Sequence, residues 1–253
     1  MGSMGEKKMV LFLTSSPMGA YRSPVPPDFQ GLDPANGLVR ELKRYWREAS
    51  RCLLVSAFPE EYSLNEGMRN DFERILHETG LSVSCMDLCD RRNGSACAER
   101  VREYDMVFLG GGHVPTENAF FREIGLRETF YGFDGIVMGI SAGSMNCAET
   151  VYAQPEMPGE AADPSYRRFI PGLGLTDVNI LPHYQAVKHD RVDGLRLMED
   201  ITYPDSFGHR FYAIPDGSFF LQAEDRKELR GEAYLISEGS IRRISEAGQV
   251  YRL

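Results

Sequence analysis

An apolar run at residues 136–138 leads directly into the small-residue sequence Gly-Ile-Ser-Ala-Gly at residues 139–143. Helix-forming residues follow at 144–149. A strand that turns into a helix at Gly-x-Ser-x-Gly exposes its serine, here Ser141, at the carboxyl end of a sheet. Free N–H groups at the start of such a helix can stabilise an oxyanion. The motif predicts a serine nucleophile, and the alternative is a capping serine at an ordinary strand–helix joint.

The composition is that of a globular protein with an acidic surface. The chain has 253 residues, of which 42% are hydrophobic, and a formal net charge of −9. A chain of this length can bury a full core. Because the charge is negative, we expect neither nucleic acid nor a membrane surface as a partner.

The five cysteines are odd in number and contain no Cys-x-x-Cys pair, which indicates reduced thiols and a cytoplasmic location. No histidine lies among Cys85, Cys89 and Cys97, so we expect no metal site, and no motif calls for a cofactor. Residues 1–8 are expected to be a cloning remnant and a short tail, and residues 9–253 a single domain. The apolar run at 9–13 is too short for a signal peptide or a membrane span.

Strand and helix patterns alternate up to the serine motif. Apolar runs predict strands at residues 9–14, 52–57, 81–88, 106–109 and 136–140. Helices are predicted at residues 36–50 (with Asn36 as the cap), 65–79, 96–103 and 116–130. This alternation predicts an α/β fold with a mostly parallel, doubly wound sheet of the flavodoxin-like type.

The pattern becomes irregular after residue 149. A loop is predicted at residues 152–170, a strand at 175–181 and a helix at 192–201. Short strands are predicted at residues 211–214, 218–223, 233–237, 240–244 and 249–253. Glu238-Gly239 is a hairpin signal between two of them. The C-terminal end is therefore expected to be rich in β-structure.

Parallel sheets bind ligands at the carboxyl ends of their strands, where Ser141 and the glycine run at residues 110–112 are both expected. An N–H group of Gly111 or Gly112, together with that of Ala142, would form a two-donor oxyanion hole. The alternative is a tight turn that binds nothing.

A serine nucleophile needs a base, and His183 is the best placed of the five histidines. It ends a predicted strand, after a proline that restricts the preceding residue to extended geometry. The alternative is a strand-end histidine whose ring is satisfied by the backbone.

Four blocks of the sequence, at residues 110–113, 139–144, 181–183 and 214–218, together resemble peptidase family S51. Their order and spacing match over about residues 9–223. That family contains dipeptidase E and cyanophycinase, and the resemblance implies a fold related to class I glutamine amidotransferases. The amidotransferases carry a cysteine at the strand–turn–helix elbow where this chain has Ser141, so Ser141 implies hydrolysis of peptides rather than of glutamine.

The resemblance implies that Ser141 is the nucleophile and His183 the general base. Asp216, in an Ile-Pro-Asp-Gly turn, matches a position where the family often carries glutamate, and it is the preferred acid. Glu156, fifteen residues after Ser141, matches another acid proposed for the triad.

Dipeptidase E prefers an N-terminal aspartate, which requires a cation in the substrate pocket. Arg191 lies near the corresponding position, and a guanidinium can bind a carboxylate through two hydrogen bonds. The alternative for Arg191 is a solvated arginine at a helix start. Other residues that could supply the cation are Arg167, Arg168, Lys188 and His189. His113 replaces the asparagine usual in dipeptidase E and is expected on the substrate side.

These features predict a serine exopeptidase that acts on short peptides, with a homodimer as a candidate assembly. The alternatives are another acyl hydrolase, such as an esterase or a cyanophycinase-like isopeptidase, and a non-catalytic ligand-binding protein.

Overall fold

The computed structural model describes residues 9–19 and 31–253, so the expected tail at residues 1–8 lies outside the described residues. Its main element is an eight-stranded sheet in the order β16-β13-β12-β1-β5-β4-β2-β3. Five strands run parallel: β1 (Val10–Thr14), β5 (Ile136–Ile140), β4 (Met106–Leu109), β2 (Ser50–Val55) and β3 (Val83–Cys89). Three are antiparallel to their neighbours: β12 (Phe219–Ala223), β13 (Arg226–Arg230) and β16 (Val250–Arg252). The predicted α/β fold with a mostly parallel sheet is confirmed.

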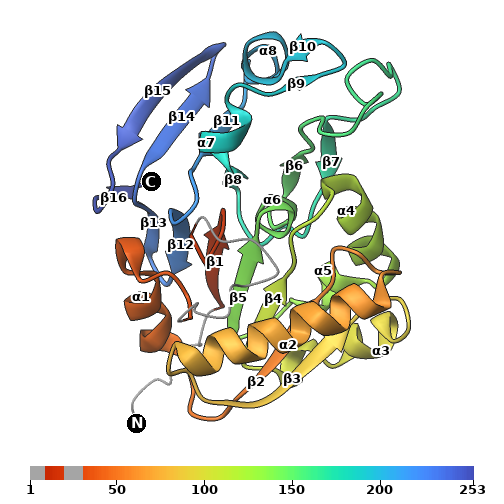
Figure 1. Ribbon diagram of the computed structural model, residues 1–253, viewed down its shortest axis with the longest axis vertical. Helices are drawn as coiled ribbons and strands as arrows, with labels where there is room; N and C mark the ends of the chain where they lie inside the picture. The colour runs from red at the N-terminus through yellow and green to blue at the C-terminus, as the bar shows by residue number, and fades with distance from the viewer. Residues whose placement is uncertain (1–8, 20–30) are drawn as a thin grey trace.

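Helices cover both faces of the sheet because its central strands are apolar on both faces. Every residue of β1 and β4 is buried, as in the interior of a parallel sheet. One core contains α1 (Leu38–Tyr45) and α2 (Tyr62–Glu78), and the other contains α3 (Gly94–Glu99), α4 (Val114–Glu123) and α5 (Leu126–Thr129). Figure 1 shows α2 lying across the strands. In the described part of the chain, no helix is both long enough and apolar enough to cross a membrane.

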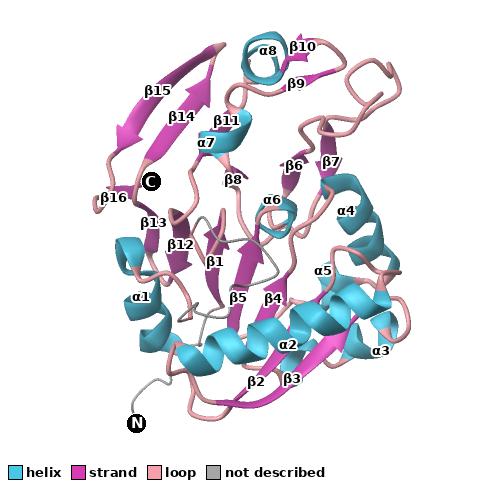
Figure 2. Ribbon diagram, in the orientation of Figure 1, coloured by secondary structure: helices cyan, strands magenta, loops and turns pink. Residues whose placement is uncertain are grey.

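A second sheet forms the β-rich C-terminal end. Its four strands, in spatial order, are β15 (Ser240–Ser245), β14 (Ala233–Ser237), β11 (Arg210–Ala213) and β8 (Asn179–Leu181). The predicted Glu238-Gly239 turn joins β14 to β15, with φ values of 48° and 75°. In Figures 1 and 2 this sheet lies beyond the end of the main sheet at which β5 meets α6 (Ala142–Asn146). The ends of β8 and β11 therefore lie close to the serine turn.

The helix predicted at residues 192–201 is wrong over its first half. Asp193 and Gly194 have φ values of 52° and 84° and form the two-residue turn between β9 (Arg191–Val192) and β10 (Leu195–Arg196). Asp-Gly favours this turn because both positions require a positive φ. Helical structure begins later, as the π-helix Leu197–Thr202 followed by α8 (Tyr203–Asp205).

Residues with positive φ also move other predicted boundaries. Asn36, with a φ of 56°, lies in a short 3₁₀ turn, so α1 begins after it and is not capped by its side chain. Gly125, with a φ of 66°, divides the helix predicted at residues 116–130 into α4 and α5. The predicted strand at 175–181 shrinks to β8. At the two ends of the predicted loop, β6 (Thr150–Tyr152) pairs with β7 (Phe169–Pro171). Strand β13 is missing from the predictions because charged residues dominate its sequence.

Candidate active site

Ser141 lies at the junction of β5 and α6, in a strained turn. Its φ of 53° and ψ of −116° fall outside the helical and extended regions. Close packing explains the flanking glycines. A Cβ atom on Gly143 would lie 2.3 Å from the carbonyl oxygen of Leu109, and one on Gly139 would lie 2.6 Å from Cα of Ser144. The local structure is therefore the strand–turn–helix elbow that the motif predicts.

His183 and Asp216 approach Ser141 from the second sheet. His183 follows β8 and Asp216 follows β11, and these two strands pair side by side. Nε2 of His183 lies 2.8 Å from Oγ of Ser141, and Nδ1 lies 2.7 Å from Oδ1 of Asp216. The His183 side chain is 24% exposed and the Asp216 side chain 9%. A hydroxyl, an imidazole and a carboxylate thus form one hydrogen-bonded series at the carboxyl ends of β5, β8 and β11.

A further side chain, that of Ser15, contacts both His183 and Asp216. Ser15 follows β1 and is fully buried. Its Oγ donates a hydrogen bond to Oδ1 of Asp216 at 2.6 Å and accepts one from the backbone N–H of His183 at 2.7 Å. Burial would raise the pKa of Asp216, but the hydrogen bonds from His183 and Ser15 outweigh it and hold the pKa below its usual 3.8. Ser15 is absent from the sequence predictions, although its place after the strand beside β5 was a usable signal.

We expect Ser15→Ala to lower kcat by about 10- to 100-fold with little change in KM, because a hydrogen bond to a charged group contributes about 1.5–3 kcal/mol. Losing this donor also lets the pKa of Asp216 rise, so the acidic limb of kcat should move to higher pH. Steady-state kinetics over about pH 4 to 8 measure both effects, with exposed Ser165→Ala as the control. An unchanged kcat and pH profile would contradict a positioning role for Ser15.

Glu156, the alternative acid, lies outside the series of Ser141, His183 and Asp216. Its Oε1 accepts a hydrogen bond from the backbone N–H of Val114 at 3.3 Å, whereas Nδ1 of His183 faces Asp216. Glu156 as a whole is exposed, but its carboxylate lies in a cavity wall, where desolvation raises the pKa of that carboxyl. The structure therefore places Glu156 beside the site, not behind the imidazole.

The glycine run after β4 borders the elbow. A Cβ atom on Gly111 would lie 3.0 Å from Cβ of Ser141, and the N–H of Gly110 is used by the carbonyl of Val55 at 3.0 Å. Within residues 9–19 and 31–253, no backbone hydrogen bond engages the N–H groups of Gly111, Gly112 or Ala142. The structure thus brings the three predicted oxyanion donors next to Ser141 with their N–H groups available.

His113 and Arg191, the predicted substrate-binding residues, lie in different settings. Nε2 of His113 lies 2.7 Å from Oε1 of Glu160, and Oε2 of Glu160 accepts the backbone N–H of Glu156 at 2.9 Å. His113 therefore anchors the loop that carries Glu156. Arg191 is exposed at the start of β9, and its Nη1 donates to the carbonyl of Gly194 at 2.9 Å. Its setting is a hairpin strand and not the helix start considered from the sequence.

Two cavities meet at Ser141, His183 and Gly112, with volumes of about 470 Å³ and 290 Å³. The larger, which we name the apolar cavity, has walls that include Met18, Phe58, Met68, Phe72, Ile75 and Ile140. The smaller, which we name the polar cavity, has walls that include Gln154, Glu156, Asp190 and Arg191. No group of His, Cys, Asp or Glu side chains that could hold a metal ion occurs among the described residues.

A model of peptidase family S51 matches residues 61–229, which is more than half of the chain. The matched segment contains the elbow, His183 and Asp216. The chain belongs to peptidase family S51. The resemblance drawn from four sequence blocks is thereby confirmed, and the protein is a member of a family of peptidases. No curated protein matches this S51 chain significantly.

Solved structures share the fold of this S51 peptidase at low sequence identity. A peptidase from an acI-B1 actinobacterium superposes with a TM-score of 0.67 and 15% identity, covering 98% of each chain. A candidate peptidase E protein from Listeria monocytogenes EGD-e superposes with a TM-score of 0.57 and 14% identity, covering 94% of this chain and 99% of that one. These similarities show that the common fold extends over nearly the whole chain.

The S51 peptidase also buries a carboxyl group beneath the elbow helix. Glu117 of α4 is fully buried, and its Oε2 accepts a hydrogen bond from Nδ2 of Asn146, in α6, at 2.9 Å. Its Oε1 has no partner among the described residues. Burial raises the pKa of Glu117 well above 4.5, and the hydrogen bond from Asn146 opposes this only in part. Glu117 is therefore a neutral acid in the folded protein at pH values where an exposed glutamate is charged.

This shift makes stability depend on pH. Above about pH 4.5 the unfolded chain releases the Glu117 proton while the folded chain keeps it. The free energy of unfolding of the wild type, minus that of Glu117→Gln, should fall by about 1.4 kcal/mol per pH unit until the folded pKa is reached. Urea unfolding at several pH values measures it, with exposed Glu128→Gln as the control. A difference that stays constant with pH would show that Glu117 is ionised when folded.

Proposed function

We propose that this S51 peptidase is a serine-type exopeptidase that hydrolyses short peptides through Ser141, His183 and Asp216. The observation that supports this proposal best is the hydrogen-bonded series in which His183 joins Ser141 at 2.8 Å to Asp216 at 2.7 Å. Geometry of this kind defines a nucleophile, a base and an orienting acid, irrespective of fold.

In the proposed reaction, His183 accepts the proton of Ser141 as its Oγ attacks the carbonyl carbon of the peptide bond. Asp216 holds Nδ1 of the imidazole protonated, so that Nε2 is the acceptor, and it stabilises the imidazolium that forms. The N–H groups of Gly111 or Gly112 and of Ala142 bind the oxyanion. His183 then donates its proton to the leaving amine, and water hydrolyses the acyl-enzyme by the same steps with water as the nucleophile.

The polar cavity supports the choice of short peptides with a free terminus. Its volume of about 290 Å³ suits a group of about one residue. Glu156 and Asp190 offer carboxylates to a terminal ammonium, and Arg191 offers a guanidinium to a carboxylate. A charged chain end would thereby gain a partner that the middle of a long peptide lacks. The preference for aspartate that dipeptidase E shows is not required by this arrangement, because Arg191 shares the polar cavity with Glu156 and Asp190.

Two measurements test the proposal. A fluorophosphonate probe should label the wild type at Ser141 and leave Ser141→Ala unlabelled. A dipeptide library should then be hydrolysed, with free dipeptides preferred to copies blocked at the N- or C-terminus. Absence of labelling would favour a non-catalytic homologue. Labelling combined with turnover of esters or β-linked peptides alone would favour another acyl hydrolase.

A further inference from the structure

We infer that the apolar cavity binds an uncharged apolar side chain of the residue beside the scissile bond, so that methionine, leucine or phenylalanine is preferred there to aspartate. This inference rests on the proposed peptidase function, because it assigns a substrate class to the same site. The apolar cavity opens directly onto Ser141 and His183. A side chain that fills it therefore belongs to a residue flanking the bond under attack.

One face of α2 forms a wall of the apolar cavity. Met68, Phe72 and Ile75 follow one another at helical spacing and all three line it. Phe72 is 5% exposed and Ile75 1%, so the wall consists of the edges of core side chains. Phe58 and Ile140 extend the apolar surface towards the elbow. A lining of this kind favours an apolar ligand because both surfaces leave water on binding.

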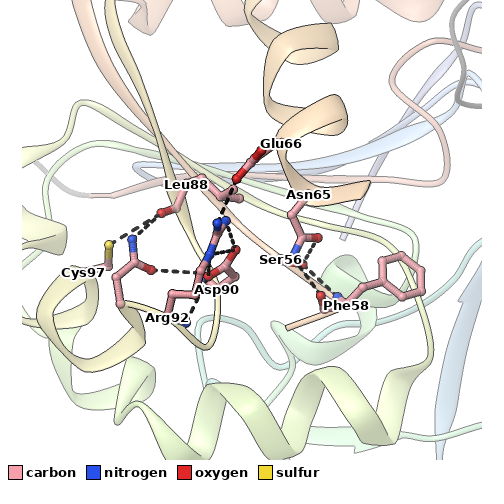
Figure 3. Close-up of polar contacts among 9 residues, drawn as sticks. Ser56, Phe58, Asn65, Glu66, Leu88, Asp90, Arg92 and Cys97 are labelled. Carbon is pink, nitrogen blue, oxygen red and sulfur yellow. Dashed lines mark hydrogen bonds and ion pairs between the residues drawn. The ribbon is translucent and has the colours of Figure 1, made fainter. Parts of the chain in front are cut away.

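Hydrogen bonds fix the wall around Phe58 before any substrate binds. Oγ of Ser56 donates to Oδ1 of Asn65 at 2.6 Å, and Nδ2 of Asn65 donates to the carbonyl of Phe58 at 2.8 Å. The backbone N–H of Phe58 donates to Oγ of Ser56 at 2.8 Å, which closes the ring of bonds (Figure 3). Because these bonds join the loop after β2 to the first turns of α2, the Phe58 wall is pre-organised, which lowers the cost of binding.

The charges around the apolar cavity disfavour an acidic side chain. Asp71 lines it, and its Oδ1 accepts a hydrogen bond from Nη2 of Arg74 at 3.1 Å. No lysine or arginine occurs among the described residues that line this cavity. A substrate carboxylate there would lose water and gain no lysine or arginine partner from the described lining. Arg191, the cation expected to select aspartate, lines the polar cavity instead.

The test is the kcat/KM of the wild type for matched dipeptides. Met-Ala, Leu-Ala, Asp-Ala and Ala-Ala form one series, and Ala-Met, Ala-Leu and Ala-Asp form the reversed series. In one of the two series, the apolar residue should exceed alanine by about 10- to 100-fold, the factor expected for burying such a side chain. The aspartyl member should be slower than alanine. Equal rates for apolar and acidic members in both series would overturn the inference.

A variant tests whether α2 sets this preference. Met68→Lys should reduce the advantage of the apolar dipeptides and raise the rate with the aspartyl one, because an ammonium then enters the cavity. The control is Asn70→Lys, which adds the same charge at an exposed position of α2 outside the cavity. Unchanged selectivity in Met68→Lys would contradict the inference that the apolar cavity binds the substrate side chain. If this variant does not fold, Met68→Gln replaces it and should weaken the apolar preference.

Failure of the proposed function gives a different result. If the wild type hydrolyses no peptide, the peptidase proposal fails while the cavity can still be examined by calorimetry. In one of the two series, Ser141→Ala should bind the methionyl or leucyl dipeptide more tightly than the matched aspartyl dipeptide, by about the same 10- to 100-fold. Equal affinities would overturn the inference on its own.

Discussion

Ser141→Ala is expected to lower kcat by roughly 10⁴- to 10⁶-fold while leaving the fold intact. The hydroxyl is the only group that this substitution removes, and alanine retains the Cβ atom that already occupies the turn. Residual turnover should come from the oxyanion donors and from substrate binding. Single-turnover and steady-state hydrolysis of the best dipeptide measure the loss.

Two further measurements make this result specific. The melting temperature of Ser141→Ala should stay close to that of the wild type, since both residues carry the same strain at a φ of 53°. Ser165→Ala, which alters an exposed serine, should retain full activity. A Ser141→Ala protein with a tenth of the wild-type kcat would rule out Ser141 as the nucleophile.

The central strands were predictable because burial on both faces leaves an unbroken apolar run. β4 and β5 begin and end where the sequence predicts, at Met106–Leu109 and Ile136–Ile140. Segments with less burial were harder to assign. Apolar residues between 192 and 201 have helical spacing, but Asp193-Gly194 takes positive φ and forms a hairpin. Local turn chemistry decided that segment, and the apolar spacing misled the prediction.

The site shows a similar division between local and long-range information. The elbow is local, so its geometry follows from five consecutive residues. The contacts of Ser15 join positions 168 and 201 residues apart in the chain, and they depend on how the second sheet meets the first. His183 itself has a φ of 57°, which its sequence neighbours do not indicate. A single sequence therefore identifies the reactive side chains, but not a residue such as Ser15 that positions them.

Asp216→Asn is expected to lower kcat by about 10⁴-fold, the size of effect seen when the acid of a serine–histidine pair is neutralised. The amide would donate a hydrogen bond to Nδ1 of His183, so that the proton moves to Nε2. Nε2 could then no longer accept the proton of Ser141.

Asp216 also becomes harder to protonate on folding, so its ionised form stabilises the folded state above pH 3.8. That contribution is lost as the pH falls through the lower folded pKa, and it should be absent from Asp216→Asn.

Glu156→Gln separates the two candidate acids. Glu156 lines the polar cavity, and Nδ1 of His183 faces Asp216 instead, so the variant should change KM for peptides with a free terminus much more than it changes kcat. Because the pKa of Glu156 is raised, its carboxylate is protonated earlier than that of an ordinary glutamate as the pH falls. Protonation removes the charge that pairs with an ammonium, so the wild-type KM should begin to increase at that higher pH. Kinetics of both variants on one dipeptide and its N-acetyl form decide the assignment. A 10⁴-fold loss of kcat in Glu156→Gln, with a mild effect of Asp216→Asn, would reverse the two roles.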